Sequence, residues 1–126
     1  MKKEGFVLSM KTVLVVDDQP GIRLLLQEVL TNEGYEVVTA QNGKEAVERT
    51  EKEEIDLLIL DYKLPILNGE EVIKKMKNKK EQIPIILVTG LGKIGLDLAG
   101  YPFVKKVVEK PFNIQGICDD VRALLR

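Results

Sequence analysis

Five short apolar runs, alternating with segments of helical periodicity, constrain the fold of this chain more than any other feature. The runs are rich in Val, Ile and Leu, and they span Thr12–Val16, Glu36–Ala40, Leu57–Leu60, Ile85–Val88 and Lys106–Val108. The first, third and fourth are almost wholly apolar, which is typical of strands buried on both faces of a parallel sheet. Strands that alternate with helices predict an open α/β sheet covered by helices on both faces.

The segments between the runs carry helical stripes of apolar residues. The first stripe, which Pro20 opens and Gly34 ends, consists of Ile22, Leu25, Leu26, Val29 and Leu30. The last predicted helix is capped by Asn113. A helix between the fourth and fifth strands would be confined to residues 93–99, because glycines and Pro102 surround it, so we expect it to be short or irregular.

Length and composition limit the classes of function. A chain of 126 residues makes one domain, which we place at 11–126 after a frayed leader at 1–10. The chain has no His and one Cys, which excludes a Ser-His-Asp triad, a His-ligated zinc site and an intramolecular disulfide. A net charge of −1 disfavours nucleic-acid binding. Apolar runs too short for a signal peptide or membrane span predict a cytoplasmic protein without a membrane partner.

The predicted strands end in chemically capable side chains. The first ends in Asp17 and Asp18, the third in Asp61 and the fourth in Thr89, and the fifth continues into Lys110. In open α/β sheets, ligands bind beyond the carboxyl ends of the strands, so these side chains should share one crevice. Taken singly, each could be an ordinary turn, cap or surface residue. Their joint occurrence at one edge indicates a site.

Three neighbouring carboxylates repel one another, and a divalent cation would keep them ionised. Oxygen ligands favour Mg²⁺, which takes one or two carboxylates and retains water or phosphate oxygens as ligands. A carboxylate in such a site can act as a nucleophile toward phosphorus. Lys110 and Thr89 could then stabilise charge on the phosphoryl oxygens.

Together these motifs resemble the receiver domain of two-component response regulators, from about Lys11 to Leu125. The resemblance rests on the strand Val13–Val16 with its acidic pair and on Leu58–Pro65 with the following Asn-Gly. It also rests on Val88-Thr89 and on Val108–Phe112. It implies a flavodoxin-like, doubly wound sheet of strand order 2-1-3-4-5 with about five helices.

The same resemblance implies roles for the site residues. Asp61 would accept a phosphoryl group from a histidine kinase or histidine phosphotransferase. The receiver would catalyse this phosphorylation of its own Asp61, with Thr89 and Lys110 completing the catalytic set. Mg²⁺ would be held by Asp18 and Asp61, by Asp17 through water, and by the backbone carbonyl of Lys63. The Lys110-Pro111 peptide bond would be cis.

A finer likeness, to stand-alone phosphorelay receivers of sporulating bacteria, implies a partner surface. Its residues here are Gln19, Gly21, Ile22, Leu25, Pro111 and Phe112. The alternative is that Ile22 and Leu25 are ordinary helix packing. Because 126 residues leave no room for an output domain, we expect a monomeric phosphorelay intermediate or docking protein that passes the phosphoryl group to a partner His.

Parts of the sequence also fit other classes of protein. Residues 90–95 fit the G-x-G-x-x-G pattern of dinucleotide-binding folds, but too few residues follow for the crossover helix that this motif must open. A dehalogenase-like phosphatase would need a second Asp at position 63, where Lys63 stands. Gly90 stands where the receiver pattern usually has a small residue such as Ala, which is a mild departure. Val107, where many receivers carry an aromatic residue, and the glycine-rich stretch in place of a regular fourth helix weaken the expectation of an aromatic switch. A phosphorylation-independent docking module is the remaining alternative.

Overall fold

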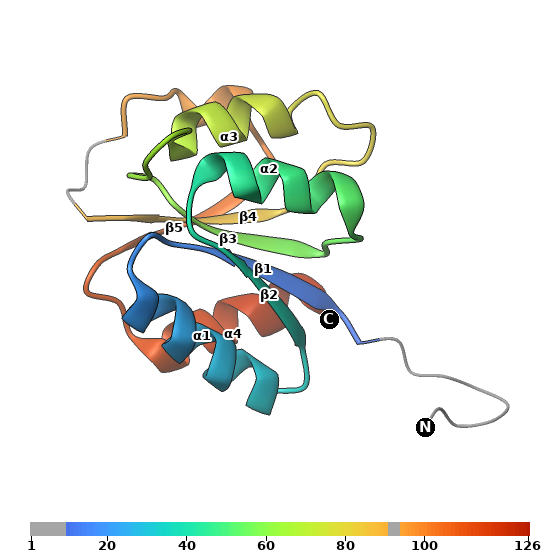
Figure 1. The fold of residues 1–126 in the computed structure, drawn as a ribbon, viewed down its shortest axis with the longest axis vertical. Coiled ribbons are helices and arrows are strands. Elements are labelled where there is room, and N and C mark those ends of the chain that lie inside the picture. The colour runs from blue at the N-terminus through green and yellow to red at the C-terminus, as the bar shows by residue number, and fades with distance from the viewer. Residues whose placement is uncertain (1–9, 91–93) are drawn as a thin grey trace, which may run out of the picture.

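A five-stranded parallel sheet runs through the centre of the computed structural model, which describes residues 10–90 and 94–126 (Figure 1). Its strands are β1 (Thr12–Val16), β2 (Glu36–Ala40), β3 (Leu57–Asp61), β4 (Ile85–Thr89) and β5 (Val104–Glu109). They lie side by side in the order β2-β1-β3-β4-β5, which confirms the predicted doubly wound topology. Every residue of β1, β3 and β4 is buried, as the apolar runs indicated.

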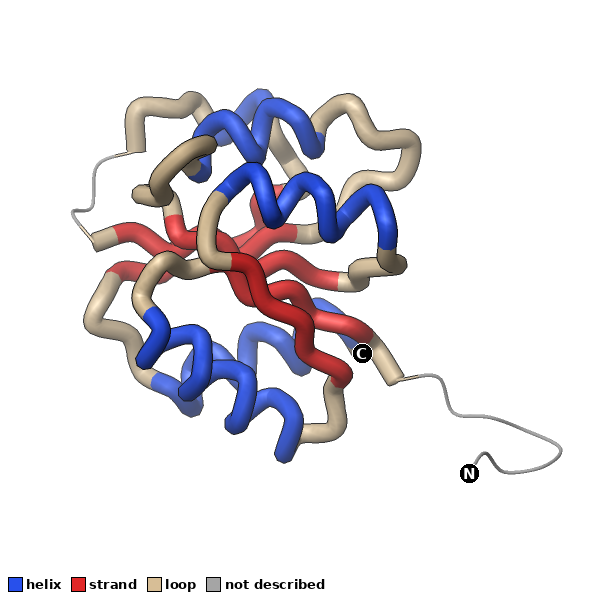
Figure 2. The backbone as a smooth tube through the Cα atoms, in the orientation of Figure 1, coloured by secondary structure: helices blue, strands red, loops and turns tan. Residues whose placement is uncertain are grey.

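Helices cover both faces of the sheet, so that the strands form the middle layer in Figure 2. The helices are α1 (Pro20–Asn32), α2 (Gly43–Lys52), α3 (Gly69–Met76) and α4 (Ile114–Leu125). Alternate residues of the strands point to opposite faces. Val13 and Val15 pack in one core cluster with residues of α1 and α4, whereas Leu14 and Val16 pack in another with residues of α2 and α3.

Asparagine side chains cap three of the four helices. Asn42, Asn68 and Asn113 accept hydrogen bonds from the backbone N–H three residues on, at 2.8, 3.0 and 2.9 Å. The side chain of Glu71 accepts a hydrogen bond from the backbone N–H of Asn68, at 3.1 Å, and completes a capping box. The cap predicted at Asn113 is therefore confirmed. These caps fix where the helices begin and hence the loops that precede them.

The segment between β4 and β5 lacks a regular α-helix in its described part. A 3₁₀ turn, η1 (Leu98–Gly100), takes its place, in agreement with the expected short or irregular helix. Residues 91–93 of the glycine-rich motif lie outside the described residues, as does most of the predicted leader, residues 1–9. Across the described chain, no helix is both long enough and apolar enough to cross a membrane.

Two details differ from the sequence-based expectation. β5 is longer than predicted, because Val104 pairs with Ile85 before a bulge resets the register to Ile86 and Lys106. The side chain of Leu25, placed on the apolar stripe of α1, is 43% exposed, and only Leu26 and Leu30 of this helix are fully buried. The buried stripe of α1 is narrower than the sequence spacing predicts, because the sheet covers only the side of the helix that carries Leu26 and Leu30.

Gly43 allows a close contact between α2 and the loop that follows β3. A Cβ atom at this position would lie 1.8 Å from the carbonyl oxygen of Leu67, closer than any real contact. At Gly21, in α1, a Cβ atom would meet nothing within 4 Å. The β3–α3 loop therefore packs directly against the first turn of α2.

We expect Gly43→Ala and Gly21→Ala to change stability in opposite directions. The first should lower the free energy of unfolding by about 1–3 kcal/mol through overpacking. The second should raise it by up to about 1 kcal/mol, because Ala is favoured over Gly in a helix. Urea denaturation measures both values. A neutral Gly43→Ala would contradict the seating of the loop.

Candidate functional site

A cleft of about 870 Å³ opens at the carboxyl edge of the sheet. The strands end at this edge on the left in Figure 1. The loops that follow β1, β3, β4 and β5 form its walls, as the strand order requires. Its lining consists of Asp18, Gln19, Asp61, Tyr62, Lys63, Leu64, Pro65, Asn68, Thr89, Gly90 and Lys110. Five of the six residues predicted to be catalytic or metal-binding are thus in this lining, and the sixth, Asp17, lies beside it.

Three carboxylates meet at the cleft. Asp17, Asp18 and Asp61 each offer a carboxylate oxygen, and these oxygens lie within 4.8 Å of one another. Asp17 and Asp61 are only 3% and 5% exposed, whereas Asp18 is exposed. Backbone N–H groups hold both buried carboxylates: that of Gln19 donates to Asp17 at 2.9 Å, and that of Lys63 donates to Asp61 at 3.3 Å.

The ammonium group of Lys110 lies between the two buried carboxylates. Its Nζ atom is 3.1 Å from Asp17 Oδ2 and 3.1 Å from Asp61 Oδ2, and it also donates to Gln19 Oε1 at 3.0 Å. The backbone N–H of Lys110 donates to the carbonyl of Thr89 at 2.8 Å, which ties the end of β5 to β4. The Lys110-Pro111 bond is cis, as expected.

Burial and the neighbouring charges change the pKa values of Asp61 and Lys110. Burial, and then the charge of Asp17, raise the pKa of Asp61, and Lys110 offsets only part of this effect. Burial disfavours the charged form of Lys110, but its hydrogen bonds to Asp17 and Asp61 outweigh this and raise its pKa. Lys110 is therefore a permanent cation beside a carboxylate whose ionisation is disfavoured.

Two neighbours of the site were not singled out from the sequence. The Nη1 atom of Arg23 donates to the backbone carbonyl of Asp17 at 2.7 Å. The hydroxyl of Tyr62 donates to Glu70 at 3.1 Å and accepts from the N–H of Gly95 at 3.2 Å, so it joins the loops after β3 and β4. In the sequence, only the position of Tyr62 directly after Asp61 indicates that it lies at the site.

The residues predicted to contact a partner have different surroundings. Gln19, Gly21 and Pro111 are exposed, and Leu25 is exposed although it belongs to an apolar stripe. Ile22 and Phe112 are partly buried and pack against the core shared by α1 and α4. The structure therefore favours a surface role for Leu25, whereas Ile22 and Phe112 contribute mainly to packing.

Comparison with known proteins identifies the family. The model of the response regulator receiver domain matches residues 13–122 of this chain. The chain belongs to this family. As such, it is the receiver domain of a response regulator of a two-component system, the coarse function that the sequence motifs predicted.

Individual relatives agree with the family assignment. The sporulation initiation phosphotransferase F of Bacillus subtilis is 40% identical over 114 residues, covering 90% of this chain and 92% of that protein. The transcriptional regulatory protein PhoP of alkaline phosphatase synthesis, from the same organism, is 38% identical over 121 residues, 92% of this chain. The present chain spans about half of PhoP, 49% of its length.

Solved structures give the same fold. The response regulator TrrA of Thermotoga maritima, in complex with Mg²⁺-BeF, matches with a TM-score of 0.82 and 41% identity over 92% of this chain and 100% of TrrA. TrrA in complex with the histidine kinase ThkA matches with a TM-score of 0.80 and 40% identity, over 93% of this chain and 100% of TrrA.

The residues of the cleft fit a magnesium ion. Receiver domains bind Mg²⁺, and the side-chain donors that meet here are three carboxylates, two of them buried and one exposed. Hard oxygen ligands at an open cleft suit an ion that retains part of its water. Lys110 balances one negative charge, so the cluster keeps an excess of negative charge that favours a divalent cation.

We expect millimolar Mg²⁺ to raise the melting temperature of the wild-type chain and EDTA to reverse this rise, because an ion that binds only the folded state stabilises it. Asp18→Asn should lose most of the rise. Glu48→Gln, which neutralises an exposed carboxylate on α2, should retain it. Differential scanning fluorimetry measures all three, and an equal rise in Asp18→Asn would contradict the metal site.

Without divalent cations, Asp61→Asn should increase the free energy of unfolding by about 0.5–2 kcal/mol, because it removes a repelling buried charge. The folded-state pKa of Asp61 is raised, so ionisation costs stability as the pH rises through that pKa. The gain should therefore be largest at neutral pH and vanish in acid, where the wild-type carboxyl is protonated too. Urea denaturation at both pH values checks this, and a loss of stability at neutral pH would contradict it.

Proposed function

We propose that this chain accepts a phosphoryl group from a phosphohistidine onto Asp61 and then transfers it to a His of another protein or signals by docking. The observation that carries this proposal is the position of Asp61 at the end of β3. Its carboxylate lies 3.1 Å from the ammonium of Lys110 and beside two further carboxylates. The name of the Bacillus relative, a phosphotransferase of sporulation initiation, supports a role in phosphoryl transfer.

In the proposed reaction an oxygen of the Asp61 carboxylate attacks phosphorus. The P–N bond of the phosphohistidine breaks, and the imidazole of the donor leaves with the bonding electron pair. Because this chain contains no His, both the donor and any final acceptor belong to other proteins. The complex of TrrA with a histidine kinase supports a kinase as the donor.

Mg²⁺ would be held by Asp18 and Asp61, with Asp17 nearby and the carbonyl of Lys63 as a further ligand. When bound, it supplies positive charge that neutralises the phosphoryl oxygens and the carboxylates. Lys110 holds a second positive charge 3.1 Å from Asp61 and can pair with the phosphoryl oxygens. Thr89, which lines the same cleft, offers a hydroxyl hydrogen-bond donor.

The partner surface of this proposal begins at Gln19 and continues onto α1. Gln19 lines the cleft, and the exposed side chain of Leu25 lies about two turns further along the helix axis. Leu24, with a side chain 65% exposed, adds apolar area beside it. Exposed apolar side chains on the helix that follows the β1 wall of the cleft suit a protein that must bring its His to Asp61.

The alternative is a receiver that docks to partners without being phosphorylated. Such a module has no use for mutually repelling carboxylates. The acidic cluster and its lysine are complete here, and this favours the phosphorylated form of the function.

The direct test is intact mass spectrometry after incubation with acetyl phosphate. We expect a gain of one phosphoryl group that requires Mg²⁺ and disappears in EDTA and in Asp61→Asn. Lys110→Ala should still be labelled but should signal poorly, because Lys110 responds to the phosphoryl group. Labelling of Asp61→Asn to the wild-type extent would place the acceptor elsewhere. No labelling of the wild type, by acetyl phosphate or by a phosphohistidine protein, would support the docking module.

A further inference from the structure

Ile66 has a backbone conformation that β-branched residues rarely adopt. Its φ angle is 69°, the only positive value of a non-glycine residue within the described ranges. The N–H of Leu67 donates to the carbonyl of Pro65 at 2.7 Å across it, which makes Ile66 the centre of a γ-turn. A γ-turn with positive φ is strained, and a branched Cβ adds to the strain.

The side chain of Ile66 gains no burial that would offset this strain. It is 75% exposed, more than any other large hydrophobic side chain in the part of the chain that the structure describes. Burial is the usual source of the stability that an Ile contributes. Folding of this chain alone therefore does not explain why Ile stands at this position, and strained residues concentrate where function requires them.

The turn that carries Ile66 is fixed on both sides. Leu67 is seated against Gly43 of α2, and the N–H of Gly69 donates to the carbonyl of Tyr62 at 2.9 Å. Asn68 forms the capping box of α3 directly after the turn. A side chain presented by so rigid a support loses little entropy when a partner contacts it.

The chemistry of the cleft indicates what covers Ile66. Asp61 is only 5% exposed, and the phosphohistidine must come from another protein because this chain has no His. A protein that brings its His to Asp61 has to close over the mouth of the cleft. Pro65 lines that mouth, and the Cα atom of Ile66 lies about 3.8 Å from that of Pro65.

We propose that Ile66 is an apolar docking residue for the protein that donates the phosphoryl group, which would present an apolar patch beside its phosphohistidine. This inference rests on the proposed function. It extends the contact from the α1 side of the cleft, where Leu24 and Leu25 are exposed, to the α3 side. Recognition from two sides would orient the imidazole toward Asp61.

Ile66→Asn and Ile66→Gly test this role, because both residues tolerate a positive φ and neither offers the apolar side chain. With autophosphorylated ThkA as the donor, we expect kcat/KM for phosphoryl transfer to fall about fivefold or more, mainly through KM. Labelling by acetyl phosphate, which needs no protein contact, should stay within about twofold of wild type. The melting temperature should be unchanged or higher, since strain is relieved.

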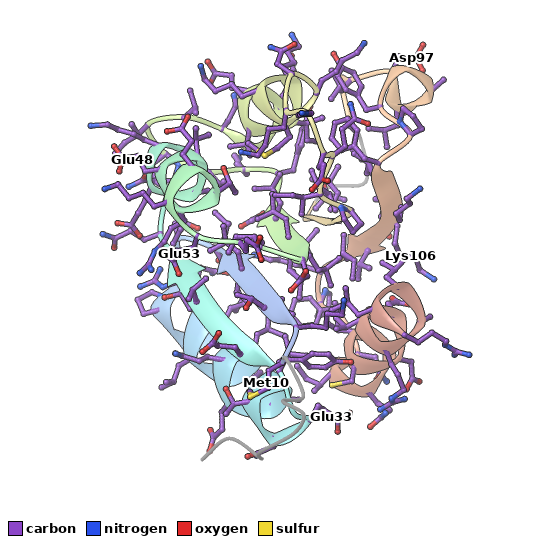
Figure 3. The ribbon with its side chains drawn as sticks, turned by 90° about the vertical axis from the view of Figure 1, so that its right-hand side faces the viewer. Met10, Glu33, Glu48, Glu53, Asp97 and Lys106 are labelled. Carbon is purple, nitrogen blue, oxygen red and sulfur yellow. The ribbon has the colours of Figure 1, made fainter. Side chains whose placement is uncertain are left out.

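Met10→Asn is the matched control. Its side chain is also exposed, at 55%, but it lies where the chain enters β1, at the edge of the sheet opposite the cleft (Figure 3). This variant should transfer at the wild-type rate. Wild-type transfer by both Ile66 variants would overturn the docking role and leave the proposed function intact. Equal losses with ThkA and acetyl phosphate would overturn it too, because Ile66 would then only support the loop. If acetyl phosphate does not label the wild-type chain, the result counts against the proposed function and not against the docking role of Ile66.

Discussion

The contact on which this structure depends is the ammonium of Lys110 between two buried carboxylates. Asp17 directly follows β1, Asp61 ends the neighbouring β3, and an oxygen of each lies 3.1 Å from the same Nζ atom. Without that cation, two negative charges would face each other at a place that water hardly reaches. The lysine makes the pair tolerable but does not neutralise Asp18, so the cleft keeps an affinity for positive charge. One arrangement thus holds two buried carboxylates in the fold and leaves the cleft with an excess of negative charge.

The parallel sheet makes this arrangement possible. All five strands end at the same edge. Four of them contribute different groups to the cleft: β1 is followed by the acidic pair, β3 ends in the carboxylate of Asp61, β4 ends in the hydroxyl of Thr89, and β5 leads into Lys110. The N–H of Lys110 bonds to the carbonyl of Thr89, which fixes the lysine relative to β4. Loops fastened by helix caps and by the Gly43 contact hold the remaining walls. The loop after β3 is therefore held in place by contacts within the described chain.

Much of this could be predicted from the sequence. Buried strands appear as continuous apolar runs, and the rule that function lies beyond their carboxyl ends grouped Asp17, Asp18, Asp61, Thr89 and Lys110 correctly in space. Asn113, the N-cap of α4, could be predicted from the sequence as well. These features depend on local composition and on one topological rule.

Other features depend on contacts that composition does not encode. The spacing of Leu25 fits the apolar stripe, but its exposure depends on how widely the sheet covers α1. The hydroxyl contacts of Tyr62 join two loops far apart in the chain. The positive φ of Ile66 contradicts the preference of its residue type, and only the fixed ends of the turn impose it. Such local exceptions are expected where a protein carries out its function.

The central claim is that Asp61 itself carries the phosphoryl group. Borohydride reduction converts an aspartyl phosphate to homoserine, and peptide sequencing by tandem mass spectrometry then locates it. We expect homoserine at position 61 alone after treatment with a phosphodonor and Mg²⁺. Homoserine at position 17 or 18, with Asp61 intact, would contradict it.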